Sequence, residues 1–261
     1  MKTRIILAIL SVALIVSIAT ACNDPGNLGL SGGQNPGDGN TSQGGGNGQA
    51  ETVTPPEDIP DEITIGGETY STYRTSIEFY EYEVTDSDLE QLRYMNNLTS
   101  LSFNASNISD ISVLGSFTNL TDLRLSNGQL SDISAIGNLT NLSSLVLNTS
   151  QISDISALST LSNLDFLELR NNQISDISAL SNLTNLRNLI LEGNQISDIS
   201  ALSVLTTSLL GVNLSNNQIT DLSALATLPN LVGVFLFGNP LTQEQVDELQ
   251  VALPDCRIFF N

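Results

Sequence analysis

Aspartates recur at a fixed spacing along this chain, and they are the residues that could do chemistry. The column consists of Asp110, Asp132, Asp154, Asp176, Asp198 and Asp221. Carboxylates stacked like neighbouring strands, roughly 4.8 Å apart, could hold Ca²⁺, and paired carboxylates can hydrolyse glycosides. However, a calcium loop supplies several ligands within about a dozen residues, and each unit here offers one carboxylate. We therefore expect each aspartate to cap a short turn by accepting backbone N–H bonds, with calcium binding as the alternative.

The composition excludes most catalytic chemistry. The chain has no histidine and no tryptophan, and its only lysine is Lys2. The absence of histidine excludes histidine bases, serine–histidine–aspartate triads and histidine-ligated metals. Apart from Lys2, no residue could form a lysine Schiff base. No insertion in the units that carry the aspartates could build a cleft for glycoside hydrolysis. We expect no enzyme activity, no metal and no cofactor.

The charge of the chain restricts its partners. The formal net charge is −20, and it becomes −22 once the segment that holds Lys2 and Arg4 is removed. Nucleic-acid binding needs a basic surface, so it is not expected. The same acidity opposes direct adsorption to anionic lipid or to phosphate-rich wall polymers.

The aspartates belong to a repeated unit of 22 residues, as the spacing of Ile152, Ile174 and Ile196 shows. Units begin at Leu98, Leu120, Leu142, Leu164, Leu186, Leu209 and Leu231, and the fifth carries one extra residue within 205–208. The consensus L-x-x-L-x-L-x-x-N-x-I-x-D-I-S-x-L-x-x-L-x-N matches the leucine-rich repeat pattern. Its leucines face inward on short strands, and coils must stack on one another to bury them.

An asparagine column accompanies the leucines. It comprises Asn172, Asn194, Asn217 and Asn239. We expect these side chains to turn inward and to bond backbone groups that the turn leaves unpaired. Ser106, Gly128 and Ser150 occupy the position in the first three units, where serine replaces part of that bonding and glycine none of it.

The unit with "NQISDISAL" resembles the internalin-type leucine-rich repeats of bacterial surface proteins over residues 98–240. The resemblance implies a solenoid, a right-handed β-superhelix with short parallel strands on its concave face and 3₁₀ turns on its convex face. It also implies that another protein is bound on the concave face.

Solenoids need caps, because terminal coils would otherwise expose their core. We expect an N-terminal cap with a degenerate repeat over residues 62–97 and a C-terminal cap helix and strand over 241–261. Thr85 with Asp88, and Thr242 with Gln245, have the spacing of capping boxes that begin short helices. Cys256 alternates with apolar residues and is expected to be buried.

The first 61 residues indicate export and tethering. Residues 1–21 form a signal peptide with a basic start and an apolar run at 5–18, which is too short to span a membrane. "ATAC" then resembles the lipobox of bacterial lipoproteins, which implies that Cys22 carries lipid and anchors the chain in a membrane outside the cytoplasm; the alternative is ordinary cleavage after Ala21. Residues 22–61 are a Gly/Asn/Ser- and Pro/acidic-rich tether of roughly 35 Å r.m.s. length.

Side chains alternate along a strand, so the residues between the inward leucines face the concave surface. The candidate ligand-binding residues are Arg124, Phe166, Glu168, Arg170, Arg187, Ile190, Glu192, Asn213, Phe235 and Phe237. Phe166, Ile190, Phe235 and Phe237 are expected to be exposed, and aromatic and arginine side chains are typical of interfaces. The alternative is that isolated apolar residues are ordinary on surfaces, and that the C-terminal cap covers the last two phenylalanines.

We expect a module tethered to the cell envelope that binds a protein partner on its concave face. A glycan-binding adhesin is a second hypothesis, although the concave columns offer Phe and only Tyr80 as stacking platforms. A passive envelope spacer is the third, and it fits the acidity and the Ser/Asn-rich rows of the first repeats.

Overall fold

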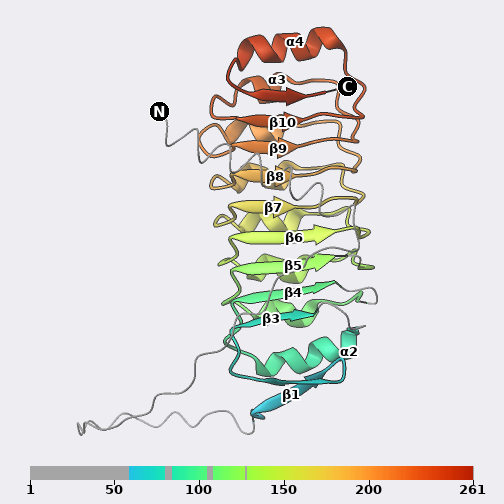
Figure 1. Ribbon diagram of the computed structural model, residues 1–261, viewed down its shortest axis with the longest axis vertical. Coiled ribbons are helices and arrows are strands. Elements are labelled where there is room, and N and C mark those ends of the chain that lie inside the picture. Colours follow the sequence, from blue (N-terminus) through green and yellow to red (C-terminus); the bar gives the residue numbers. More distant parts are fainter. Residues whose placement is uncertain (1–58, 80–83, 105–107, 127, 261) are drawn as a thin grey trace, which may run out of the picture.

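A computed structural model describes residues 59–79, 84–104, 108–126 and 128–260 of the chain. These residues wind into a stack of coils, each with a strand on one side and a short helical turn on the other (Figure 1). The fold is a leucine-rich repeat solenoid, which confirms the predicted fold class. The candidate leader and Cys22 lie outside the described residues.

One parallel sheet runs the length of the stack, and the described residues give it nine strands. In order along the sheet they are β3 (Ser76–Phe79), β4 (Ser100–Asn104), β5 (Asp122–Ser126), β6 (Ser144–Asn148), β7 (Phe166–Glu168), β8 (Asn188–Ile190), β9 (Gly211–Asn213), β10 (Gly233–Phe235) and β11 (Arg257–Phe259). Equivalent residues of successive repeats are in register, as with Leu145, Leu167 and Leu189. The 22-residue period therefore sets the strand pairing directly.

The core lies between the sheet and the convex turns. The inward residues of each coil, such as Leu164, Leu167 and Ile174, have no exposed surface. They join one contiguous cluster that extends from the N-terminal cap to Cys256. Each Å² of apolar surface removed from water contributes about 25 cal/mol to the free energy of folding. Much of this surface is buried between neighbouring coils, so each coil stabilises the next.

The convex side consists of short helical turns, as predicted. Among the described repeats, five of these turns are 3₁₀ helices: η2 (Ser112–Ser116), η3 (Ser134–Asn138), η4 (Ser156–Thr160), η5 (Ser178–Asn182) and η6 (Ser200–Val204). The sixth, α3 (Ser223–Ala226), is an α-helix, and there the expectation of 3₁₀ geometry is wrong. Its Ala226 N–H donates to Leu222 O, four residues back, at 3.3 Å. The two alanines of this turn favour the wider α-helical bonding over the tighter 3₁₀ bonding.

The aspartate column caps these turns, as predicted. In each repeat the Asp Oδ1 accepts the backbone N–H of the residue two positions later at 2.8 Å, as Asp154 does from Ser156. This bond stabilises the ionised carboxylate, so the pKa values of Asp110, Asp132, Asp154, Asp198 and Asp221 lie below the usual range. Within the described residues no group of three or more acidic, histidine or cysteine side chains is placed to hold a metal ion.

The asparagine column also behaves as predicted. Asn194 Nδ2 donates to Leu169 O at 2.9 Å and to Leu191 O at 3.0 Å, and its Oδ1 accepts from Ile174 N at 3.1 Å. Asn172 and Asn217 make equivalent bonds. One buried amide thus satisfies main-chain groups of neighbouring coils.

Caps close both ends of the solenoid. The N-terminal cap contains the hairpin of β1 (Glu62–Ile65) and β2 (Glu68–Ser71), followed by α2 (Asp86–Leu89) and η1 (Glu90–Tyr94). The C-terminal cap is α4 (Gln243–Ala252), which lies over the last coil, together with β11 (Figure 1). Both predicted capping boxes form. None of the described helices is long and apolar enough to cross a bilayer.

Candidate functional site

The strand register arranges the outward-facing side chains of the sheet in columns. The central column runs Arg124, Val146, Glu168, Ile190, Asn213, Phe235 and Phe259. Val146 and Ile190 are buried but do not belong to the core cluster, which fits their position on the opposite face of the sheet from the leucines. This face is the predicted concave surface.

Five polar side chains in the middle of the face form a connected set, the concave network: Asn148, Glu168, Arg170, Glu192 and Asn213. Arg170 Nε lies 2.8 Å from Glu168 Oε1, and its Nη1 lies 3.2 Å from Glu192 Oε2. Asn148 Nδ2 donates to Glu168 at 2.9 Å, and Asn213 Nδ2 donates to Glu192 at 3.0 Å. The network therefore ties four consecutive coils together on the concave side.

Glu168, Arg170 and Asn213 of the concave network are buried, and Asn148 and Glu192 are half-buried, in contrast to the exposed surface expected from strand alternation. Glu168 is 2% exposed and Arg170 is 7% exposed, whereas Arg124 two coils earlier is exposed. The Arg170 Nε contact is an ion pair without hydrogen-bond alignment, and Nη2 has no hydrogen-bond partner in the described part of the chain. Buried ion pairs lose hydration that their attraction only partly restores, so this network contributes less to stability than its short distances suggest.

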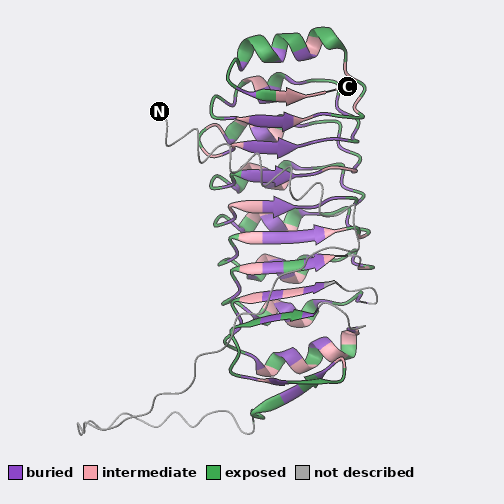
Figure 2. Cartoon of the chain, viewed as in Figure 1, coloured by how far each residue is buried: buried purple, intermediate pink, exposed green. Residues whose placement is uncertain are grey.

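The expectation that Ile190 is exposed is wrong, because its side chain has no exposed surface. It stands in register between Glu168 and Asn213, and Asn188 and Glu192 flank it on its own chain segment. Its nearest positions on this face of the sheet are thus all occupied by polar residues. In Figure 2, β8 and β9 are buried along their whole length, whereas β3, β4 and β11 retain exposed or intermediate positions.

Three phenylalanines at the C-terminal end of the same face form the aromatic cluster: Phe235, Phe237 and Phe259. Phe259 stacks on Phe235 with ring centroids 4.4 Å apart and planes 6° apart, and Phe237 lies 6.4 Å from Phe235. Phe237 is 38% exposed, whereas Phe235 and Phe259 are half-buried. The alternative of a covering cap therefore holds for Phe235 and fails for Phe237.

Sequence reasoning missed Phe259, because the closing strand does not follow the repeat. Its only signal was the alternation in "CRIFF", which places Arg257 and Phe259 on the face opposite Cys256. The pairing of Gly233 with Arg257 and of Phe235 with Phe259 extends the concave columns into the cap. The cap is thus part of the concave surface.

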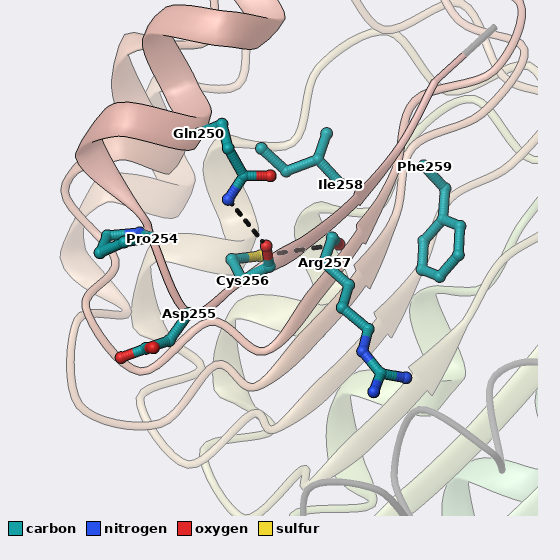
Figure 3. A pocket seen from close by; sticks show the side chains of 7 residues that line it. All are labelled: Gln250, Pro254, Asp255, Cys256, Arg257, Ile258 and Phe259. Carbon is teal, nitrogen blue, oxygen red and sulfur yellow. Dashed lines mark hydrogen bonds between the residues drawn. The ribbon is translucent and has the colours of Figure 1, made fainter.

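A hollow of about 670 Å³ lies between α4 and β11. It is lined by Gln250, Pro254, Asp255, Cys256, Arg257, Ile258 and Phe259 (Figure 3). Arg257 is exposed and has no carboxylate partner within the described ranges. In Figure 3 its side chain and that of Phe259 extend to the same side of the strand, away from Gln250.

The remaining predicted residues lie apart from this end. Arg124 makes a two-pronged pair with Asp122, with N···O distances of 2.9 and 3.0 Å. Arg187 pairs with Asp165 at 3.5 Å at the edge of the face, where both are exposed to solvent. Phe166 is half-buried in the first column of β7.

The Cys256 thiol takes no part in the concave contact surface. Its thiol is buried in the core, and this burial raises its pKa to about 12. A thiol that stays protonated is a poor nucleophile, which agrees with the predicted structural role.

Comparison with known proteins places these features in a family context. The model of the family described as leucine-rich repeats (2 copies) matches residues 162–204. Internalin C2 from Listeria monocytogenes is 30% identical, with 75% of this chain and 86% of that one covered and a TM-score of 0.64. The internalin inlF of the same organism is 26% identical over 75% of this chain and 77% of its own, with a TM-score of 0.51. A plant ice-binding protein shares the fold, with 19% identity over 75% of this chain and 65% of that one and a TM-score of 0.59. No curated protein sequence matches the chain.

Proposed function

Because the chain belongs to the internalin family of leucine-rich repeat proteins, we propose that it is a recognition module that binds a protein partner at the C-terminal end of its concave face. The aromatic cluster and Arg257 form the contact surface. The concave network holds the neighbouring coils rigid, so that this surface is preorganised and little entropy is lost on binding.

The observation that carries the proposal is the exposure of Phe237 beside the stacked pair of Phe235 and Phe259. The same face presents Ser100, Ser102 and Ser144 in the first repeats. Large aromatic side chains that gather at one end of an otherwise small and polar face are typical of binding hot spots. An exposed apolar cluster of this kind is otherwise a liability for solubility.

Membrane tethering is the second part of the proposal. A lipid anchor on Cys22 and a tether over residues 22–61 place the repeats outside the cytoplasm, at a distance from the membrane. A Cys22→Ala variant is expected to be released from the membrane fraction or to remain unprocessed. Normal maturation and unchanged membrane association of that variant would refute the anchor.

The binding proposal is tested by photocrosslinking on intact cells. A photoreactive residue at position 237 is expected to yield a discrete crosslinked protein species. The matched control carries the same residue at Val204, an apolar side chain that is 53% exposed on the convex turn η6. The same species from both positions, or none from position 237, would contradict the proposal.

Glycan binding is a second candidate function, and a hollow elsewhere on the molecule supports it. A hollow of about 410 Å³ near the N-terminal ends of the strands is lined by Tyr73, threonines and asparagines. Tyr73 is 68% exposed, and Thr121 Oγ1 donates to Thr99 O at 3.1 Å, which leaves its lone pairs to accept from a sugar hydroxyl. A polysaccharide array probed with the protein and with a Tyr73→Ala variant tests this candidate. Equal signals from the two proteins would exclude it.

A further inference from the structure

β11 ends the sheet of the described residues and has one free edge. Its inner edge is bonded to the neighbouring coil, where Arg257 N donates to Val232 O and Leu236 N donates to Phe259 O, each at 2.8 Å. In a parallel ladder alternate residues direct their main-chain groups to opposite edges. Ile258 therefore directs its N–H and C=O outward, where no described strand pairs with them.

The cap helix closes the beginning of this edge and leaves the rest open. Gln250 Nε2 donates to Cys256 O at 3.1 Å, and Cys256 N donates to Leu253 O at 3.1 Å. The outward groups of Cys256 are thus already satisfied, whereas those of Ile258 adjoin the hollow of about 670 Å³. An extended chain could enter along the open part of the edge.

The side chains at the edge define what would fit there. Arg257 and Phe259 project to the concave side, two residues apart (Figure 3). In register with Arg257 the preceding coils have Gly233 and Gly211, which leave its guanidinium uncrowded. In a chain of net charge −20, Arg257 is exposed and without a carboxylate partner in the described part.

We propose that the outer edge of β11 pairs with an extended segment of the partner that carries a carboxylate and an apolar side chain two residues apart. The inference rests on the proposed protein-binding function and specifies the chemistry of the partner. Main-chain bonds to Ile258 give strand addition. The carboxylate pairs with Arg257 in a charge-assisted bond, and the apolar side chain lies against Phe259 as a cross-strand neighbour.

A second copy of the chain is a poor occupant of the same edge. Two molecules that each carry a net charge of −20 repel one another as they approach. Antiparallel pairing centred on Ile258 would also place each Arg257 opposite Phe259 and leave both guanidinium groups without a carboxylate. The unpaired Arg257 therefore favours a partner segment that places a single carboxylate opposite it.

The test uses the full chain and a capped synthetic peptide, Thr-Thr-Glu-Thr-Val-Thr-Thr. Saturating peptide is expected to slow amide exchange at Ile258 at least about tenfold, because its N–H becomes bonded. A peptide with glutamine in place of glutamate, or an Arg257→Gln protein, is expected to bind at least about fivefold more weakly. A peptide N-methylated at alternate amides is expected not to bind.

The inference would be overturned if the peptide did not bind, if its affinity did not depend on the carboxylate and Arg257, or if exchange at Ile258 did not change. Protection of Ile258 through dimers of the chain, seen by sedimentation without peptide, would overturn it as well. The proposed function is tested separately, by measuring how far the affinity of the full-length partner protein depends on Phe237. If the peptide does not bind but the affinity of the partner protein still depends on Phe237, only the proposed site at the edge of β11 is rejected.

Discussion

Phe259 of the closing strand lies flat on Phe235 of the preceding coil, with ring centroids 4.4 Å apart. The stacked pair continues the central column of the concave face beyond the last full repeat. The C-terminal cap therefore does two things: it covers the core through α4, and it completes the outer surface through β11. Phe237, beside this pair, remains the most exposed member of the cluster.

The stacked pair is expected to contribute to stability, whereas Phe237 is not. Phe259→Ala removes a half-buried ring and exposes Phe235, so the free energy of unfolding should fall by about 1–2 kcal/mol, less than for a fully buried phenylalanine. Phe237→Ala should change it by less than about 0.5 kcal/mol, as is usual for surface substitutions. Urea unfolding of both variants measures the difference. Equal losses would show that Phe237 is held as firmly as the stacked pair.

The asparagine column should dominate the polar contribution to stability. Asn194→Ala removes bonds to Leu169, Leu191 and Ile174 and leaves buried main-chain groups unpaired. The expected cost is about 2–3 kcal/mol. Asn185→Ala is the matched control, because its amide bonds Ser162 O at 2.9 Å in an exposed position, and it should cost less than about 1 kcal/mol. Similar losses for the two variants in denaturant unfolding would contradict this role.

A side chain at Gly193 is predicted to be destabilising, even though the equivalent positions of neighbouring coils hold Thr149, Asn171 and Asn216 with positive φ. Its φ is +72°, and a Cβ placed there would collide with Asn171 Oδ1 of the preceding coil. Gly193→Ala should therefore cost about 2 kcal/mol or more, since left-handed strain alone costs about 1–3 kcal/mol. Adding Asn171→Gly removes the collision and should restore part of the loss. A double variant no more stable than the single one in thermal unfolding would show that the collision is not the cause.

The aspartate caps predict a specific pH dependence. A folded-state pKa lowered by the Ser156 N–H means that Asp154 adds stability above its unfolded pKa, near 3.9, and loses it as pH falls through the folded value. NMR titration should give a lower pKa for Asp154 than for aspartate in a short peptide. Asp154→Asn retains an oxygen acceptor and should remove this part of the acid sensitivity. A peptide-like pKa would contradict the capping role.

Periodic and local features were predictable from sequence. The inward leucines, the asparagine column and the aspartate caps repeat every 22 residues, so each repeat tests the interpretation of the others. Both capping boxes depend on residues only three positions apart. These patterns specify backbone bonds that form within a coil or between equivalent positions of adjacent coils.

The details of the surface were less predictable, because they depend on side-chain contacts between columns. Alternation places Ile190 on the concave face correctly but does not reveal that it is enclosed there. The pairing of Arg170 with both Glu168 and Glu192 depends on rotamers that no repeat constrains. Phe259 joins the surface through a strand that lies outside the repeat pattern, so the repeat register could not indicate it.

The central claim is tested most directly by the affinity of the crosslinked partner, once purified, for the wild-type protein and for Phe237→Ala. Truncation of a hot-spot aromatic should cost at least about 2 kcal/mol, or near thirtyfold in Kd, while the thermal midpoint stays nearly unchanged. Val204→Ala, the truncation of another exposed apolar side chain on the convex turn η6, should leave Kd unaltered. Isothermal titration calorimetry that gives the same Kd for wild type and Phe237→Ala would contradict recognition at this end of the concave face.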